Sequence, residues 1–174
     1  MKIALLGSIP KGDSERWGWA DWKPEFINAI THHVADAVFL NGDAVSDALG
    51  PSLVVGHDLS MVKEADCVVV DATSKIGAGT AQEMVIAKLF AKPVISVVPQ
   101  DSHYHKSEVT FHGQLVKNWI HPFISVSSDF VANSPEDAGR WIARYLGDPN
   151  FKAKDMSVFR ECIEEFDRLH IVTK

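Results

Sequence analysis

The chain has 174 residues, of which 46% are hydrophobic and 23% are charged, and its formal net charge at pH 7 is -6. This composition is typical of a folded globular protein and excludes an intrinsically disordered chain. The acidic balance argues against a nucleic-acid polymer or an anionic membrane as the main partner, because both require clustered positive charge. A small anionic ligand stays compatible with it, since backbone amides at a helix N-terminus can hold one.

Short apolar runs rich in β-branched residues predict the strands. In chain order, the candidate strands are residues 3–6, 37–40, 67–70, 94–98 and 123–126. The runs at 3–6, 67–70 and 94–98 are continuous and not alternating, as expected for strands buried on both faces of a parallel sheet.

Stretches with helical periodicity separate these runs. In chain order, the candidate helices are residues 24–33, 59–64, 80–90, 135–146 and 156–169. Alternating strands and helices predict an α/β fold, a doubly wound and mostly parallel flavodoxin/Rossmann-like sheet with helices on both faces. We expect one domain, residues 1–148, followed by a helical extension, residues 149–174, that either packs on the domain or serves dimerisation.

The segment from residue 67 to residue 83 is the most informative for function. Its strand ends at Asp71, a loop with Gly77 and Gly79 follows, and a helix is predicted to begin near Thr80. Ligands of open α/β sheets bind in the crevice outside the carboxyl ends of the strands. We expect the two glycines to adopt positive φ and to let the backbone approach a ligand closely.

Glu83 has two interpretations. With Thr80 as the N-cap, it would form the far half of a capping box, which is a purely structural role. Alternatively, the helix N-terminus holds its carboxylate ionised in the crevice, ready to attack the anomeric carbon of a sugar. Such a reaction passes through an oxocarbenium-like transition state, which a carboxylate stabilises.

Two other carboxylates have the same ambiguity. Asp58 is either the N-cap of the helix that follows it or a second catalytic carboxylate. Asp71 either ties down the loop after its strand or contacts the ligand. Trp17, Trp19 and Trp22 follow the first strand, and each either packs the first helix or stacks on a nucleobase.

No metal or cofactor is predicted. His103, His105, His112 and His121 have no recognised zinc spacing, and we expect them to lie in an exposed loop. The two cysteines have no metal-type spacing either, and they indicate reduced thiols in a cytoplasmic protein.

Four blocks of sequence in a fixed order resemble a known family. They are residues 5–9, residues 33–37, residues 58–59 with 65–69, and residues 77–83 with 92–95. Over residues 1–146 the chain resembles the nucleoside 2-deoxyribosyltransferase-like family, most closely its 2′-deoxynucleoside 5′-monophosphate N-glycosidase branch. The resemblance implies that Glu83 is a nucleophile that forms a glycosyl-enzyme intermediate and that Asp58 contacts the sugar and positions this carboxylate. It also implies that Gly7 and Ser8 line the sugar or 5′-phosphate pocket.

The resemblance adds further expectations. Pro10 stands where the N-glycosidase branch has an arginine, so Lys11 would supply the charge for a phosphate. His33 corresponds to a pocket histidine, Trp19 lies in the region that covers the nucleobase, and Ser107 corresponds to a phosphate-binding serine offered by a partner subunit. A homodimer or higher homo-oligomer acting on a small-molecule nucleoside or nucleotide is therefore expected.

Two alternatives stay open. One is a phosphoribohydrolase of the cytokinin-activating type, whose glycine loop residues 77–83 partly match. The other is a nucleotide-binding sensor on the same fold without turnover, because a fold does not determine an activity. The base, the sugar, the need for a 5′-phosphate and the choice between hydrolysis and transfer also stay open.

Overall fold

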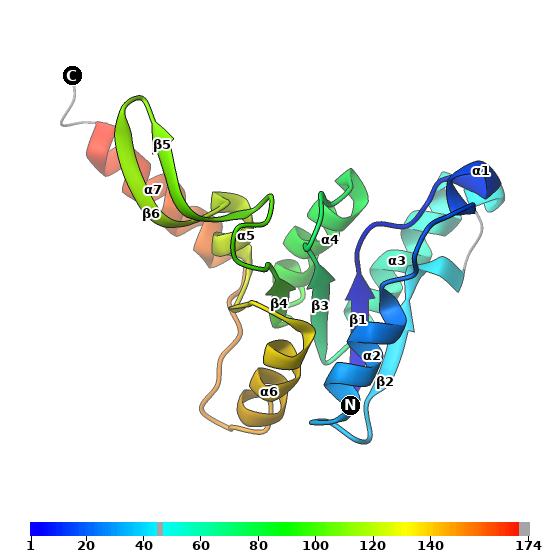
Figure 1. Cartoon of the computed structure of the whole chain (residues 1–174). Coiled ribbons are helices and arrows are strands. Elements are labelled where there is room, and N and C mark those ends of the chain that lie inside the picture. Colours follow the sequence, from blue (N-terminus) through cyan, green and yellow to red (C-terminus); the bar gives the residue numbers. More distant parts are fainter. Residues whose placement is uncertain (45–46, 171–174) are drawn as a thin grey trace.

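The architecture is a five-stranded, wholly parallel sheet with helices on both faces, as a computed structural model describes it for residues 1–44 and 47–170 (Figure 1). The strand order is β2-β1-β3-β4-β7. This is the flavodoxin-type doubly wound order, so the predicted fold class is confirmed. The strands are β1 (Lys2–Leu6), β2 (Val38–Asn41), β3 (Cys67–Asp71), β4 (Val94–Val97) and β7 (Phe130–Ala132).

The central strands are buried on both faces, which is why their sequences are continuous apolar runs. All residues of β3 and β4 are buried, and so is β1 after its first residue. The register aligns Leu6 with Val70 and Asp71 with Val97, so the carboxyl ends of these strands meet at one edge of the sheet. Loops that follow the strands converge at this edge.

Two layers of helices cover the sheet. On one face α2 (Lys23–Thr31) and α6 (Pro135–Tyr145) bury a cluster around Phe26, Ile30 and Trp141. On the other face α3 (Pro51–Glu64), α4 (Ala78–Leu89) and α5 (Pro122–Ser127) bury a cluster that includes Met84 and Ile124. Ser134 caps α6 as expected, because its hydroxyl accepts a hydrogen bond from the Asp137 amide at 3.1 Å.

One predicted element is wrong, and another is longer than predicted. Residues 123–126 form most of α5 and not a strand, because Pro122 occupies the first helical turn and the buried positions, Ile124 and Ser127, are three apart. The fifth strand is β7 instead. The short helix predicted at 59–64 is the last part of the longer α3, which begins at Pro51 after Gly50 at φ 93°.

The histidine-rich stretch is a β-hairpin and not a loop. β5 (His105–Phe111) and β6 (Gln114–Ile120) pair antiparallel and extend away from the main sheet (Figure 1). The turn between them consists of His112 and Gly113, at φ 49° and 81°. A two-residue turn with both φ values positive matches the right-handed twist of a hairpin.

The remaining elements are α1 (Gly12–Arg16), two short 3₁₀ turns (Gly42–Ala44 and Asp47–Leu49) and α7 (Ser157–His170). α7 was predicted from its amphipathic spacing and contacts α5. Within the described part of the chain, no helix is long and apolar enough to cross a membrane. The division of the chain after residue 148 stays a prediction.

Candidate active site

Glu83 lies in the second turn of α4, at the edge of the sheet where the strands end. The N-cap of α4 is Gly77, so Thr80 lies inside the first turn and is not the cap. The Thr80 hydroxyl donates a hydrogen bond to the carbonyl of Gly7 at 3.2 Å and so joins α4 to the loop after β1. The capping-box interpretation of Glu83 is therefore wrong, and its carboxyl is available for another role.

The carboxyl of Glu83 is partly buried, and its pKa is raised to about 7. Burial is the largest cause, the negative charge of Asp58 adds to it, and the positive charge of Lys11 opposes both. The expectation that the helix N-terminus holds this carboxylate ionised is wrong, because the helix dipole acts mainly within the first turn. The same electrostatics show that Asp58 and Lys11, predicted as site residues, lie near Glu83.

Asp58 lies in the interior of α3 and is not an N-cap, since the helix begins at Pro51. Its Oδ1 lies 3.1 Å from Nδ1 of His57. A Cβ atom added to Gly42, just after β2, would lie 2.9 Å from the same oxygen. Gly42 has no positive φ, so a glycine is required here for space and not for backbone conformation. The sequence has Asn-Gly-Asp after β2, but nothing in these three residues indicates that Gly42 lies against Asp58.

Gly7 is packed against Trp22. A Cβ atom on Gly7 would lie 2.5 Å from the Trp22 ring and 3.1 Å from Cβ of Asp71. The indole of Trp22 donates a hydrogen bond to the carbonyl of Ser8 at 3.1 Å, and its ring packs edge-on against Phe26 at 4.9 Å. Trp22 therefore holds the loop after β1 in place, as its packing interpretation expects.

The other two tryptophans differ in exposure. Trp17 is 90% exposed, whereas Trp19 is partly buried. The ammonium group of Lys23 lies 4.7 Å from the centroid of the Trp19 ring. One face of this ring is thus engaged by a cation. Stacking of a nucleobase on Trp19 stays a prediction.

A cluster of charged side chains lies next to Gly42. Asp43 accepts two hydrogen bonds from the guanidinium of Arg16, which lower the pKa of its carboxyl. Lys23 is only 6% exposed, and its ammonium lies 2.9 Å from Asp21 and 3.7 Å from Asp43. These contacts attach α1 and the start of α2 to the end of β2. The sequence does not predict this cluster, because Asp43 comes close to Arg16 and Lys23 only in the folded chain.

Asp71 ties down the loop after β3. Its Oδ1 accepts hydrogen bonds from the amide of Thr73 at 3.0 Å and from the Thr73 hydroxyl at 2.7 Å. Gly77, the N-cap of α4, and Gly79, in the first turn of that helix, have no positive φ, so that expectation is wrong. A Cβ atom on either glycine would meet nothing within 4 Å, which leaves the backbone open to a ligand.

His33 and Ser107 have partners outside this group. His33 lies between α2 and β2 and pairs with Glu136 in the first turn of α6, and its role in the pocket stays a prediction. Ser107 lies in the hairpin, and its hydroxyl donates to Asp101 at 2.9 Å. The predicted role of Ser107 depends on a partner subunit and stays a prediction.

Across residues 1–44 and 47–170, no three His, Cys, Asp or Glu side chains converge in a way that would hold a metal ion. His105, from the histidine-rich stretch, is buried, and its Nε2 lies 2.8 Å from the side-chain oxygen of Asn118. That histidine therefore serves the packing of the hairpin.

No protein-family model matches the chain, and no curated protein matches it. Among solved structures, the chain is similar to the CMP N-glycosidase BcmB of Clostridium botulinum. The two chains share 12% sequence identity with a TM-score of 0.47, over 82% of this chain and 97% of the other. A likeness of this degree carries no information on the activity of this chain, which has to come from the geometry of the site.

Proposed function

We propose that the protein cleaves or exchanges the N-glycosidic bond of a nucleoside, a deoxynucleoside or its 5′-monophosphate, with Glu83 as the nucleophile. The observation that supports this most is the partly buried carboxyl of Glu83 at the ligand-binding edge of the sheet, with the charges of Asp58 and Lys11 close to it. A carboxyl with a perturbed pKa in such a crevice is a candidate catalytic group.

The proposed reaction has two steps. The Glu83 carboxylate forms a bond to the anomeric carbon while the carbon–nitrogen bond breaks, and the base leaves with the bonding electron pair and takes up a proton. A water molecule, or a second base, then attacks the same carbon and gives up a proton, and the bond to Glu83 breaks to release its carboxylate. The negative charge of Asp58 stabilises the positive charge that develops on the sugar. Lys11 is the candidate partner for a 5′-phosphate.

A pKa of about 7 makes this proposal testable by pH. Only the ionised carboxylate can attack, so we expect kcat/KM to rise as the pH increases through about 7 and to level off above it. A rate that instead falls as the pH rises through this range would mean that Glu83 works in its protonated form, as a proton donor to the leaving base.

The first experiment measures base release from ribo- and deoxyribonucleosides and their 5′-monophosphates. We expect the wild type to release a base and Glu83→Gln to lose roughly 100-fold or more of that rate, because the nucleophile is gone. Glu25→Gln, at an exposed position of α2, is the matched control and should keep full activity. Mass spectrometry of a slow substrate should detect the sugar on the peptide that contains Glu83.

The same panel separates the alternatives. Release from ribonucleotides alone would favour the phosphoribohydrolase. No release from any compound, with or without an added acceptor base, contradicts the enzymatic proposal. If a nucleotide then still raises the melting temperature, the sensor is the better interpretation.

A further inference from the structure

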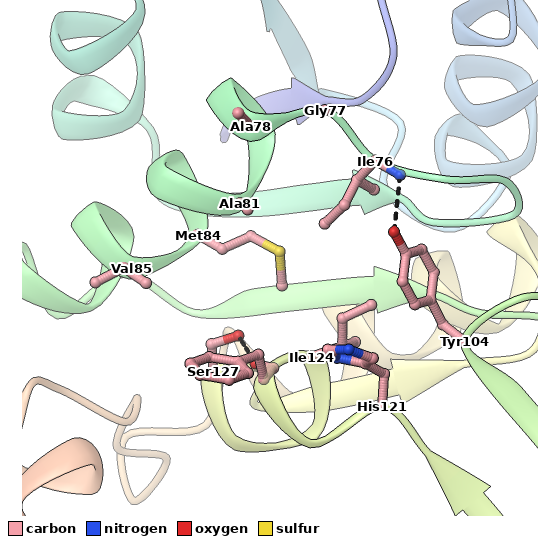
Figure 2. A pocket seen from close by; sticks show the side chains of 11 residues that line it. Ile76, Gly77, Ala78, Ala81, Met84, Val85, Tyr104, His121, Ile124 and Ser127 are labelled. Carbon is pink, nitrogen blue, oxygen red and sulfur yellow. Dashed lines mark hydrogen bonds between the residues drawn. The ribbon is translucent and has the colours of Figure 1, made fainter.

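A hollow lies beside α4. Its volume is about 310 Å³, and it lies between α4, α5 and the base of the hairpin (Figure 2). Ala81, Met84 and Val85 of α4 form one wall, and Ile124 of α5 lies opposite. Glu83 does not line it, and the charges that act on the Glu83 carboxyl are those of Asp58 in α3 and of Lys11. The hollow and the candidate active site are therefore separate.

The hollow exists because α4 carries small side chains where it faces α5. Ala78 and Ala81 are exposed, and their small side chains leave the space between the helices open to solvent. The lining contains no Asp, Glu, Lys or Arg side chain. A charged ligand would lose its hydration there without gaining an ionic partner.

His121 contributes an unpaired polar atom to this lining. Its Nδ1 is buried and has no hydrogen-bond partner among the described residues. The ring is held in place, because the His121 amide donates to the carbonyl of Tyr104 at 2.9 Å and the two rings meet edge-on at 5.5 Å. Leaving a buried polar atom unpaired is unfavourable, so a ligand that offers it a hydrogen bond is favoured.

The two hydroxyl groups that line the hollow, those of Tyr104 and Ser127, already take part in hydrogen bonds. The Tyr104 oxygen accepts a hydrogen bond from the Ile76 amide at 3.1 Å, which leaves the Tyr104 hydroxyl proton to be donated (Figure 2). The Ser127 hydroxyl donates to the carbonyl of Phe123 at 2.5 Å. The polar groups offered to a ligand are thus the His121 nitrogen and the Tyr104 hydroxyl.

We propose that this hollow binds a small, uncharged aromatic heterocycle, whose ring packs on Met84 and Ile124 and whose polar edge pairs with His121. The volume is at the lower end of those of ligand pockets, which suits one or two fused rings. The absence of a charged side chain from the lining disfavours a nucleotide with its phosphate. The site is independent of the proposed activity at Glu83.

The test uses methyl NMR of protein labelled at its methionines, of which the chain has four. Benzimidazole is the probe, and the methyl resonance of Met84 should shift saturably while that of the exposed Met156 does not. Ala81→Phe fills the hollow and should abolish the shift. The matched control is Ala143→Phe, at an exposed position of α6 on the other face of the sheet, and it should bind as the wild type does.

His121→Phe tests the polar contact without filling the hollow. It should weaken benzimidazole binding about tenfold, the equivalent of one hydrogen bond, while indene, which has the same shape and no nitrogen, should bind both proteins equally. The inference is overturned if Met84 does not respond to either probe, or if Ala81→Phe folds and still binds. It is also overturned if Ala81→Phe converts an oligomer to a monomer, since the hollow would then be an interface between copies of the chain.

Discussion

Glu83 combines burial with a neighbouring negative charge, and both raise the pKa of its carboxyl from 4.5 to about 7. The folded protein therefore binds a proton here more tightly than the unfolded chain does. The stability that this proton provides is fully present below about pH 4.5 and is lost as the pH rises through about 7. Glu83 thus destabilises the fold at neutral and alkaline pH, which is a common property of functional carboxylates.

Glu83→Gln should stabilise the protein increasingly as the pH rises. The amide has a similar shape and never ionises, so the gain in free energy of unfolding should be of order 2 kcal/mol larger at about pH 8 than at about pH 5. Urea unfolding of both proteins at the two pH values measures it. Glu25→Gln, at an exposed position of α2, is the control for the loss of one carboxyl charge. An equal effect of Glu83→Gln at both pH values would mean that the pKa of Glu83 is not raised.

Gly42 is the second residue at which a substitution has a specific expected effect. In Gly42→Ala the new methyl group would lie 2.9 Å from Oδ1 of Asp58, so the carboxylate has to move. We expect a loss of about 10-fold or more in kcat and a lower pKa of Glu83 in the pH–rate profile, since Asp58 helps to raise that pKa.

Gly56→Ala is the matched control, because this glycine lies in α3 and a Cβ atom there meets nothing within 4 Å. It should gain about 0.5–1 kcal/mol of stability and keep its activity. Equal kinetics of Gly42→Ala and the wild type would show that the position of Asp58 does not matter to catalysis.

At the scale of elements, a buried ion pair joins α4 to the C-terminal part of the chain. Lys88 and Asp129 pair with almost no exposure of either side chain. Asp129 also accepts hydrogen bonds from the amides of Val94 and Lys154 at 2.7 Å, and the Lys88 ammonium donates to the carbonyl of Lys92 at 2.9 Å. One carboxylate thus connects α4, β4 and the segment after α6.

Asp129→Ala should lower the free energy of unfolding by about 3–5 kcal/mol, because it leaves the Lys88 ammonium buried without a counter-charge. Chemical unfolding at neutral pH measures this. The control is Glu108→Ala in the hairpin, which breaks an exposed pair with Lys117 and should change stability by less than about 1 kcal/mol. Similar losses for the two variants would contradict the structural importance of the buried pair.

At the scale of the whole molecule, α7 presents an apolar stripe. Ile163, Phe166 and Leu169 recur at helical spacing and are about 60% exposed. Large exposed apolar side chains that form one stripe favour association. The expected homo-oligomer is therefore most easily tested through this helix.

Phe166→Glu should lower the molar mass measured by light scattering after size-exclusion chromatography, because a charge in the stripe opposes its burial. Glu164→Lys, on the polar side of α7, is the control and should leave the molar mass unchanged. A wild type that is monomeric at all concentrations would contradict the expected oligomer, and the same mass for Phe166→Glu and an oligomeric wild type would place the interface elsewhere.

The sequence alone determined the strands of the sheet and the region of the candidate active site. Continuous apolar runs at β1, β3 and β4, separated by helical stretches, indicate buried parallel strands, and parallel strands bring their carboxyl ends to one edge. This was enough to predict the doubly wound fold and to single out the loop that leads to Glu83. Runs such as residues 123–126 were ambiguous, because a short apolar segment has no period that distinguishes a helix from a strand.

Only the tertiary structure decided which side chains contact one another. It showed that Glu83 does not cap its helix, that Gly42 leaves room for Asp58, and that His33 pairs with Glu136. It also paired Lys88 with Asp129 across the fold. The physical reason is that propensity and periodicity act between near neighbours in the chain, whereas burial, charge proximity and the pKa of Glu83 depend on segments that only folding brings together.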